Sequence, residues 1–206
     1  MPKQVDHRER REAIARALWR VVDQRGVLHL SLREVAREAG ISHGQLQHYF
    51  TSRQALLAFA MDFAAEQTSL RVSRSLGELG DPPHPRDVLR LMLTEMLPLH
   101  ADARATSRMN AAFVLEALHD REVLVRTRDG MLQGRAQVQE LIRQAIEDGL
   151  IGSDRDPMTE TNLFLALTGF ATLIELEVVD PQDVLAAVDR HLDGLFSQGA
   201  SPGPPR

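Results

Sequence analysis

The sequence contains no cysteine, so neither a disulfide framework nor a thiolate metal site is available to it. It has no apolar run approaching the ~20 residues of a membrane span, and none follows the basic residues at its N-terminus. We therefore expect a cytoplasmic protein without a membrane span or signal peptide. Its histidines lack zinc-ligand spacing, and it has no phosphate-binding glycine loop or nucleophile elbow. These absences argue against an enzyme, and we expect no catalytic site, metal or cofactor.

Charge is unevenly distributed along the 206 residues, whose formal net charge is −5. Residues 1–60 carry ten basic and six acidic side chains, a net charge of +4. The remaining residues carry 14 basic and 23 acidic side chains, a net charge of −9. A basic head on an acidic body is typical of a protein that binds nucleic acid with one end only.

Three closely spaced helix starts lie between Ser31 and Arg53. Each has a hydroxyl residue followed three positions later by Glu or Gln: Ser31 with Glu34, Ser42 with Gln45, and Thr51 with Gln54. In such a capping box each side chain hydrogen-bonds the backbone N–H of the other residue. Gly40 stands where a left-handed residue must end the first of two short helices. The segment therefore predicts a helix-turn-helix.

These residues resemble the DNA-binding region of the TetR family of transcriptional regulators over roughly residues 8–60. That family shares the pattern S-x-x-x-x-A-x-x-A-G-x-S, an aromatic pair that ends the recognition helix, and a basic residue that opens helix four. Those places are held by Ser31, Ala36, Ala39, Gly40, Ser42, Tyr49, Phe50 and Arg53. The resemblance implies a DNA-binding domain over 1–51 and a helical ligand-binding and dimerisation domain over 52–197.

Apolar periodicity predicts an all-α protein of about nine helices with no strand. After a loose arm over 1–6, we expect helices over 7–25, 32–39, 43–49, 52–76, 89–97, 102–118, 121–148, 157–179 and 181–196. Residues 77–85 hold two glycines and three prolines and are expected to form a loop. Residues 198–206, which include SPGPPR, are expected to be a disordered tail.

A recognition helix presents polar side chains to base edges while flanking groups bind phosphates. The predicted DNA-binding residues are Ser31, Arg33, Ser42, His43, Gly44, Gln45, Gln47, His48, Tyr49 and Arg53. By resemblance, Tyr49, Arg53 and the two serines contact phosphate, as does Arg33. Gln47 stands where the family most often has Tyr. Its amide could pair bidentately with adenine, or it could be a solvated side chain.

The resemblance also implies an effector cavity among helices four to eight. The candidate lining residues are Phe59, Phe63, Gln67, Met92, Met96, Met109, Phe113, Glu116, Arg128 and Arg135. The apolar ones could equally be plain core, and a pair between Glu116 and an arginine would give the same sequence pattern. The only Trp and Tyr are Trp19 and Tyr49, which argues against an aromatic cage for a quaternary ammonium ligand in the body. Residues 181–196 are similar to a subgroup with choline-responsive repressors, but in a dimer-forming helix.

The last two predicted helices are too apolar for one chain to cover easily, so a second subunit is the simplest cover. The predicted dimer residues are Phe164, Leu167, Phe170, Ile174, Val184, Val188, Leu192 and Leu195. Together these features predict a homodimeric repressor that binds a palindromic double-stranded operator and is released by a small-molecule effector. The alternatives are a helical small-molecule-binding protein without sequence-specific DNA binding, or a transcriptional activator.

Overall fold

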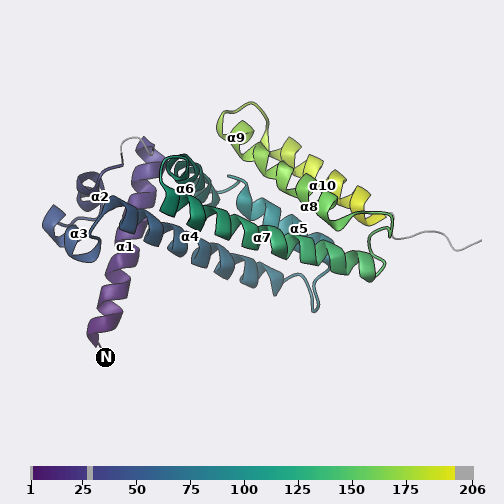
Figure 1. The fold of residues 1–206 in the computed structure, drawn as a ribbon, viewed down its shortest axis with the longest axis horizontal. Coiled ribbons are helices and arrows are strands. Elements are labelled where there is room, and N and C mark those ends of the chain that lie inside the picture. The colour runs from purple at the N-terminus through teal and green to yellow at the C-terminus, as the bar shows by residue number, and fades with distance from the viewer. Residues whose placement is uncertain (1, 27–29, 198–206) are drawn as a thin grey trace, which may run out of the picture. The chain divides into compact units, whose positions relative to one another are not determined.

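The computed structural model describes residues 2–26 and 30–197. Throughout these ranges the regular elements are helices, which confirms the all-α prediction (Figure 1). They are α1 (Pro2–Arg25), α2 (Leu32–Glu38), α3 (His43–Tyr49), α4 (Arg53–Leu76), α5 (Pro85–Met96), α6 (Ala101–Ala117), α7 (Arg121–Glu147), α8 (Pro157–Ala166), the 3-10 turn η2 (Leu167–Gly169), α9 (Phe170–Glu175) and α10 (Pro181–Ser197). None of the helices described is long and apolar enough to cross a membrane. The predicted tail, 198–206, lies outside the described residues.

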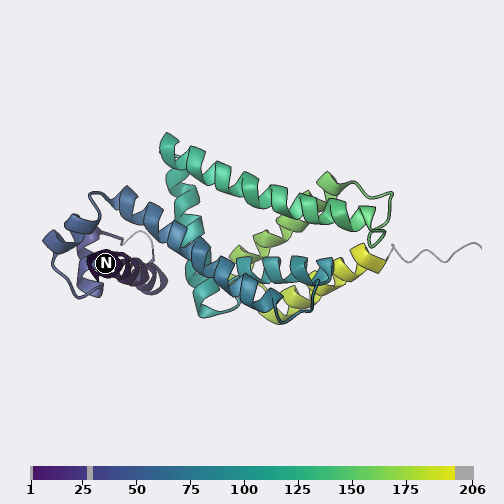
Figure 2. The ribbon, with the colours of Figure 1, turned by 90° about the horizontal axis from the view of Figure 1, so that it is seen from below.

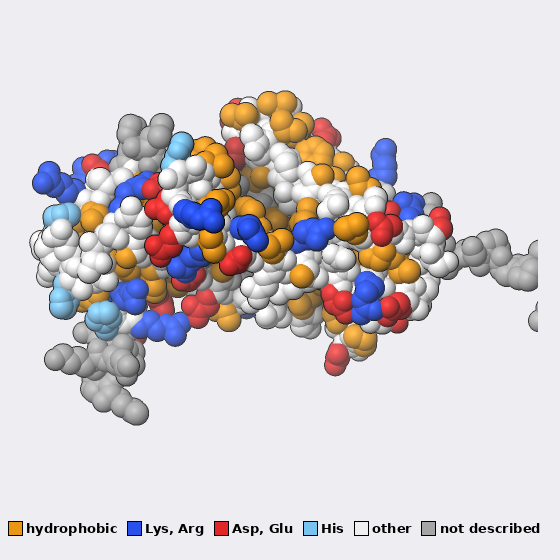
Figure 3. All heavy atoms as spheres, in the orientation of Figure 1, with side chains coloured by type: hydrophobic (Ala, Val, Ile, Leu, Met, Phe, Trp, Pro, Cys, Tyr) orange, Lys and Arg blue, Asp and Glu red, His pale blue; other side chains and the backbone are white. Residues whose placement is uncertain are grey.

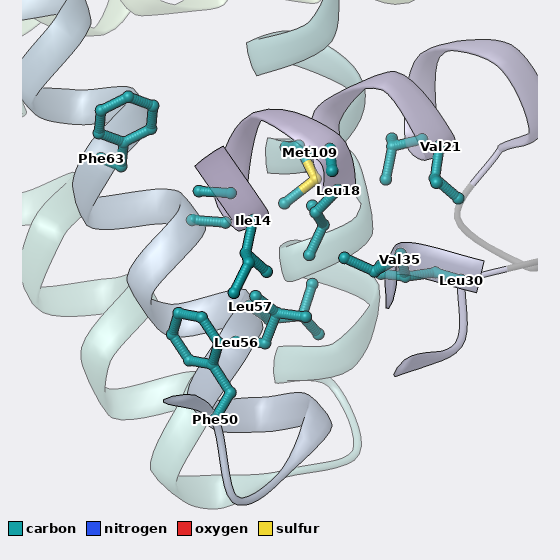
Figure 4. Packing of buried hydrophobic residues seen from close by; sticks show 14 of the residues in the cluster. Ile14, Leu18, Val21, Leu30, Val35, Phe50, Leu56, Leu57, Phe63 and Met109 are labelled. Atoms are coloured by element: carbon teal, nitrogen blue, oxygen red, sulfur yellow. The ribbon is translucent and has the colours of Figure 1, made fainter. Parts of the chain in front are cut away.

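The chain divides into two compact units. We call Met1–Arg71 with His100–Leu124 the head unit, and Val72–Leu99 with Val125–Arg206 the body unit. This division differs from the one expected at residues 51 and 52, because α6 belongs to the head. Its Met109 and Phe113 are buried in one cluster with residues of α1 and α4, and Figure 4 shows Met109 beside Leu18.

The turn between α2 and α3 forms as the sequence predicts. The Ser42 hydroxyl accepts a hydrogen bond from the Gln45 N–H at 3.1 Å, and the Ser42 N–H donates to Gln45 Oε1 at 2.9 Å. Gly40 has a φ of +67°, and the Ile41 N–H closes the turn on the Ala36 carbonyl at 3.0 Å. Local hydrogen bonds therefore fix how α3 leaves α2.

The other two predicted helix starts differ in detail. Ser31 caps α2 by accepting from the Glu34 N–H, but the Glu34 carboxylate accepts from Arg25 and Arg37 instead of completing the box. The box predicted at Thr51 is wrong. Ser52 caps α4, and its hydroxyl accepts from the Ala55 N–H at 3.0 Å.

Two predicted helix boundaries are also wrong. α1 already begins at Pro2, where a loose arm was expected, and proline is well tolerated in the first turn of a helix. The helix expected over 157–179 is interrupted by η2 and ends at Glu175. Glu177, at a φ of 56°, takes the left-handed place that follows a helix, and the Val178 N–H reaches back to the Leu173 carbonyl at 2.9 Å.

The body unit corrects part of the predicted dimer surface. Five of its residues are only 0–3% exposed within a single chain: Phe164, Val184, Val188, Leu192 and Leu195. They share a core with Leu89, Leu93 and Leu97, because α5 packs along α10 and covers its apolar face (Figure 2). The other three, Leu167, Phe170 and Ile174, are partly buried against the same core. This face of α10 is therefore covered within one chain.

Ion pairs fasten α5 to α10 beside this core. Arg90 donates to both carboxylate oxygens of Asp189, at 2.6 and 3.2 Å, and Arg86 Nε donates to Asp193 at 2.7 Å. The hydrogen bond from Arg90 is the largest cause of a lowered pKa at Asp189. The α5–α10 contact is thus apolar in its centre and ionic at its edge.

Candidate nucleic-acid interface

Helix α3 has one face in the head core and the opposite face in solvent. Leu46 and Phe50 are buried, and they anchor the helix. Gly44, Gln47 and His48 are exposed. Figure 3 shows histidine side chains on the surface around α3. The arrangement leaves a short polar helix face free to contact another molecule.

Gln45 and Gln47 differ in what their amides can offer. The Gln45 Oε1 atom is used by the capping box, so its side chain cannot also give the paired donor and acceptor that read adenine. Gln47 is exposed and its amide has no hydrogen bond among the described residues. Gln47 is therefore better placed than Gln45 for bidentate base contact.

Gly44 is open to close approach. A Cβ atom built at this position meets nothing within 4 Å in the protein. The glycine is therefore not required by internal packing. Without a side chain at this position, the α3 backbone is open to close approach from outside.

Tyr49 lies at the end of α3 beside the first helix. Its ring centroid is 4.9 Å from that of His7 and 5.6 Å from that of His48. A hollow of about 350 Å³ next to it is lined by residues of α1, of α3 and of the turn before α3: Arg10, Ile41, Gly44, Gln45, His48 and Tyr49. His7 and Arg10 were not predicted to belong to this surface, because only the packing of α1 against α3 brings them there.

Most arginines of residues 1–60 are held by acidic side chains. Paired in this way are Arg8, Arg16, Arg20, Arg25, Arg37 and Arg53. The hydrogen bonds that Arg8 donates to Glu12 and then to Glu66 raise the pKa of Arg8. By contrast, Arg10 and Arg33 are exposed and have no acidic partner among the described residues. Two of the acidic partners, Glu66 and Glu116, lie outside residues 1–60, so the cationic surface is less positive than the +4 counted for those residues alone.

Arg53, the predicted phosphate contact at the start of α4, is one of the paired arginines. Its Nη1 donates to Glu116 Oε2 of α6 at 3.0 Å. Glu116 was predicted to line the effector cavity, with an ion pair as the open alternative. The structure shows the ion pair.

The ten predicted effector residues divide between the two units. In the head, Phe59, Phe63, Met109 and Phe113 pack in or against the core, while Gln67 lines a hollow of about 340 Å³ together with Phe63, Trp19 and three arginines. In the body, Met92 packs against the core, Met96 and Arg128 are exposed, and Arg135 donates to Gln139 and Asn162. Met109 and Phe113 are thus core residues and not side chains that line a cavity.

Another hollow, of about 610 Å³, lies between α1 and α4 and includes the parallel rings of Phe59 and Phe63. The Arg11 guanidinium carbon lies 4.2 Å from the Phe59 centroid and 5.0 Å from that of Phe50. Arg11 therefore already covers Phe59, and Arg16, whose guanidinium carbon lies 5.1 Å from the Phe63 centroid, covers the second ring.

Comparison with known proteins agrees with this geometry. Residues 14–59 match the family described as bacterial regulatory proteins, tetR family, and residues 85–197 match BetI-type transcriptional repressor, C-terminal. The HTH-type transcriptional regulator PksA of Bacillus subtilis (strain 168) is 34% identical over 199 residues, 95% of this chain and 94% of PksA. The chain belongs to the TetR family of transcriptional regulators. It is a regulator rather than an enzyme.

Solved TetR-family structures share the fold. A regulator from Rhodococcus sp. aligns with a TM-score of 0.75 at 25% identity, covering 91% of this chain and 98% of that chain. A regulator from Saccharomonospora viridis, solved in complex with choline, aligns with a TM-score of 0.76 at 18% identity, covering 90% of this chain and 94% of that chain. The BetI-type match begins at α5 and includes α6, which in this TetR-family protein packs with the head.

Proposed function

We propose that the protein binds a palindromic operator as a homodimer, represses transcription there, and is released by a small-molecule effector. The observation that carries this proposal is the geometry of α3. Its inner face is anchored by Leu46 and Phe50, and its outer face presents Gly44, Gln47 and His48. A short helix supported in this way fits the major groove with its N-terminal turns towards the bases.

The direct test is a footprint with the purified protein on the DNA upstream of its own gene. We expect two protected half-sites whose centres lie ~34–36 Å apart, one turn of the duplex, as for other dimeric helix-turn-helix proteins. Reporter expression from that promoter should rise when the gene is deleted. Binding without sequence preference, or a fall in expression on deletion, would contradict operator-specific repression.

We propose that the dimer forms through exposed residues of α8, α9 and α10 instead of the buried face of α10. Leu163 and Leu173 are 49% and 36% exposed on α8 and α9, and Figure 3 shows hydrophobic side chains at the surface along these helices. On α10, the small residues Ala186, Ala187 and Gly194 are exposed, which would let a second helix approach closely. An exposed apolar face next to small residues favours a contact between two copies.

Substitution with arginine tests this surface. Leu163→Arg should convert the dimer to monomer, as measured by light scattering after gel filtration, because a charge would be buried at the contact. Met158→Arg is the matched control, since Met158 is similarly exposed, at 53%, but projects from a different side of α8. Dimers that persist in Leu163→Arg, or dissociate equally in Met158→Arg, would place the contact elsewhere.

We propose further that the effector is not a quaternary ammonium compound, although the Saccharomonospora viridis regulator was solved with choline. Phe164 of the body is fully buried, and in the head hollow Arg11 covers Phe59 while Arg16 lies over Phe63. Millimolar choline should leave the operator complex intact in a gel shift. Release of operator DNA by choline would contradict this proposal.

A further inference from the structure

We infer that Glu116 of α6 limits the affinity of the protein for DNA by holding Arg53 away from the phosphate backbone. In this role Glu116 is a positioning residue, because it acts through Arg53 rather than by touching DNA. The inference rests on the proposed function, since it concerns how tightly the operator is held. It assigns to Glu116 a part in DNA binding instead of the effector contact expected from the sequence.

The ion pair joins two helices that are far apart in sequence. Arg53 is the first residue of α4, and Glu116 lies in the last turn of α6, 63 residues later. Their side chains are 34% and 30% exposed, so the pair is partly shielded from solvent yet reachable from outside. Arg53 also follows the capping residue Ser52, at a helix N-terminus of the kind that attracts phosphate.

Helix α6 holds Glu116 in place through its packing in the head. Met109 and Phe113 are buried in the head core, and they precede Glu116 by seven and three residues on one side of the helix. Arg108 donates to the backbone carbonyl of Asp23 at 2.6 Å and to its carboxylate at 2.9 Å. The position of Glu116 therefore follows from contacts of α6 with α1.

The pair matters because few arginines of residues 1–60 are free of an acidic partner among the described residues. Only Arg10 and Arg33 are exposed without an acidic partner among the arginines of residues 2–26 and 30–60. A phosphate near Arg53 must either displace the Glu116 carboxylate or bind next to this negatively charged group. Both outcomes weaken the contact, and the partial burial reduces the screening of that repulsion by salt.

The arrangement also couples DNA affinity to the position of α6. A ligand that favours the state in which the pair is closed would weaken operator binding, and one that favours an open pair would strengthen it. Such a ligand acts only to the extent that it binds the two states differently. Glu116 would thus transmit a shift of α6 to the DNA-binding surface as a change in available charge.

The test is a double-mutant cycle on the full-length protein with the operator defined by footprinting. Glu116→Gln, Arg53→Gln and the double variant are compared with wild type by fluorescence anisotropy at several salt concentrations. Glu116→Gln should tighten binding by about 3- to 10-fold and make the slope of log K against log salt more negative by about 0.9, the value for one added phosphate contact. In the Arg53→Gln background the same substitution should change affinity by less than about twofold.

Glu38→Gln is the matched control. It removes one acidic charge from the head and releases Arg20, whose pair with Glu38 measures 2.6 Å. Glu38→Gln should affect affinity less than Glu116→Gln, and melting curves should show all variants folded. Glu116→Asp, which keeps the charge but shortens the side chain, should lie between wild type and Glu116→Gln.

Three results would overturn the inference. Glu116→Gln could leave affinity unchanged or weaken it, it could act equally in the Arg53→Gln background, or Glu38→Gln could have the same effect. If the wild-type protein binds its operator, any of these results would contradict the inference but leave the proposed function standing. Wild-type protein that binds no specific DNA would remove the proposed function, and the inference with it.

Discussion

The helix-turn-helix of the head unit is fixed by short-range hydrogen bonds, whereas the body unit is held by helices packed over apolar faces. In the head, seven-residue helices are fixed at their ends by Ser31, Ser42 and Gly40. In the body, α5 and α10 meet through leucine and valine side chains, and ion pairs lie at the edge of the contact. A short helix needs its caps because it has few turns to stabilise it. The proposed DNA-binding surface is therefore positioned by local contacts, and the body by packing between distant segments.

The largest expected effect comes from truncating a buried phenylalanine in either unit. Phe50→Ala in the head and Phe164→Ala in the body should each lower the free energy of unfolding by about 3–5 kcal/mol, because each leaves a cavity. Trp19, the single tryptophan, lies in the head, so its fluorescence follows head unfolding while circular dichroism follows the helices of both units. Phe50→Ala should shift both signals, and Phe164→Ala should shift mainly the circular dichroism.

Those two signals also decide whether the units are energetically distinct. If both probes move together in both variants, the chain unfolds as one cooperative block. The contrast between head and body would then describe geometry only.

The next largest effect is a loss of operator affinity without a loss of stability. Gly44→Ala should weaken operator binding by roughly tenfold or more, the loss of about one good base contact, because the methyl group holds α3 away from the groove. The protein itself has room for that methyl group. Gly130→Ala in α7 is the control, since its Cβ also meets nothing within 4 Å. Alanine at either position favours the helix, so both variants should melt at or above the wild-type temperature, but only Gly44→Ala should lose DNA affinity. Equal affinities of the two variants would mean that α3 does not approach DNA closely.

A smaller effect follows from removing a helix cap. Ser42→Ala should lower the free energy of unfolding by about 1 kcal/mol and also weaken operator binding, because α3 loses the hydrogen bonds that fix its start. Asp156→Ala removes the cap of α8 in the body, where the carboxylate accepts from the Thr159 N–H at 2.9 Å. It should lower stability but leave operator affinity unchanged. Weaker operator binding by Asp156→Ala would show that order in α8 reaches the DNA-binding surface.

Local chemistry explains what the sequence predicted well. The Ser42–Gln45 box and the left-handed Gly40 each depend on residues within four positions of one another, so their pattern determines the turn. The reciprocal box at Ser31 does not form, because the Glu34 carboxylate accepts from Arg25, in another helix, as well as from its neighbour Arg37.

Longer-range features were predicted incompletely for the same reason. Periodicity correctly marked one face of α10 as buried, but it could not tell that α5 rather than a second subunit covers it. Glu116 was recognised as a polar residue on an apolar stripe, yet its partner lies 63 residues away. His7 and Arg10 reach the α3 surface only through the packing of α1. Sequence spacing identifies faces, and tertiary structure assigns their partners.

The smallest effect tests the ionic edge of the body through its dependence on pH. The pKa of Asp189 is lowered, first by the hydrogen bond from Arg90, so the pair stabilises the fold above the unfolded value of about 3.9. This contribution is lost as pH falls through the lowered folded value. Because the pair is partly exposed, Asp189→Asn should cost less than about 1 kcal/mol at neutral pH. The difference in melting temperature between Asp189→Asn and wild type should therefore shrink as the pH is lowered towards and below 3. A difference that persists in acid would mean that the carboxylate contributes through packing rather than charge, and that the α5–α10 contact is apolar to its edge.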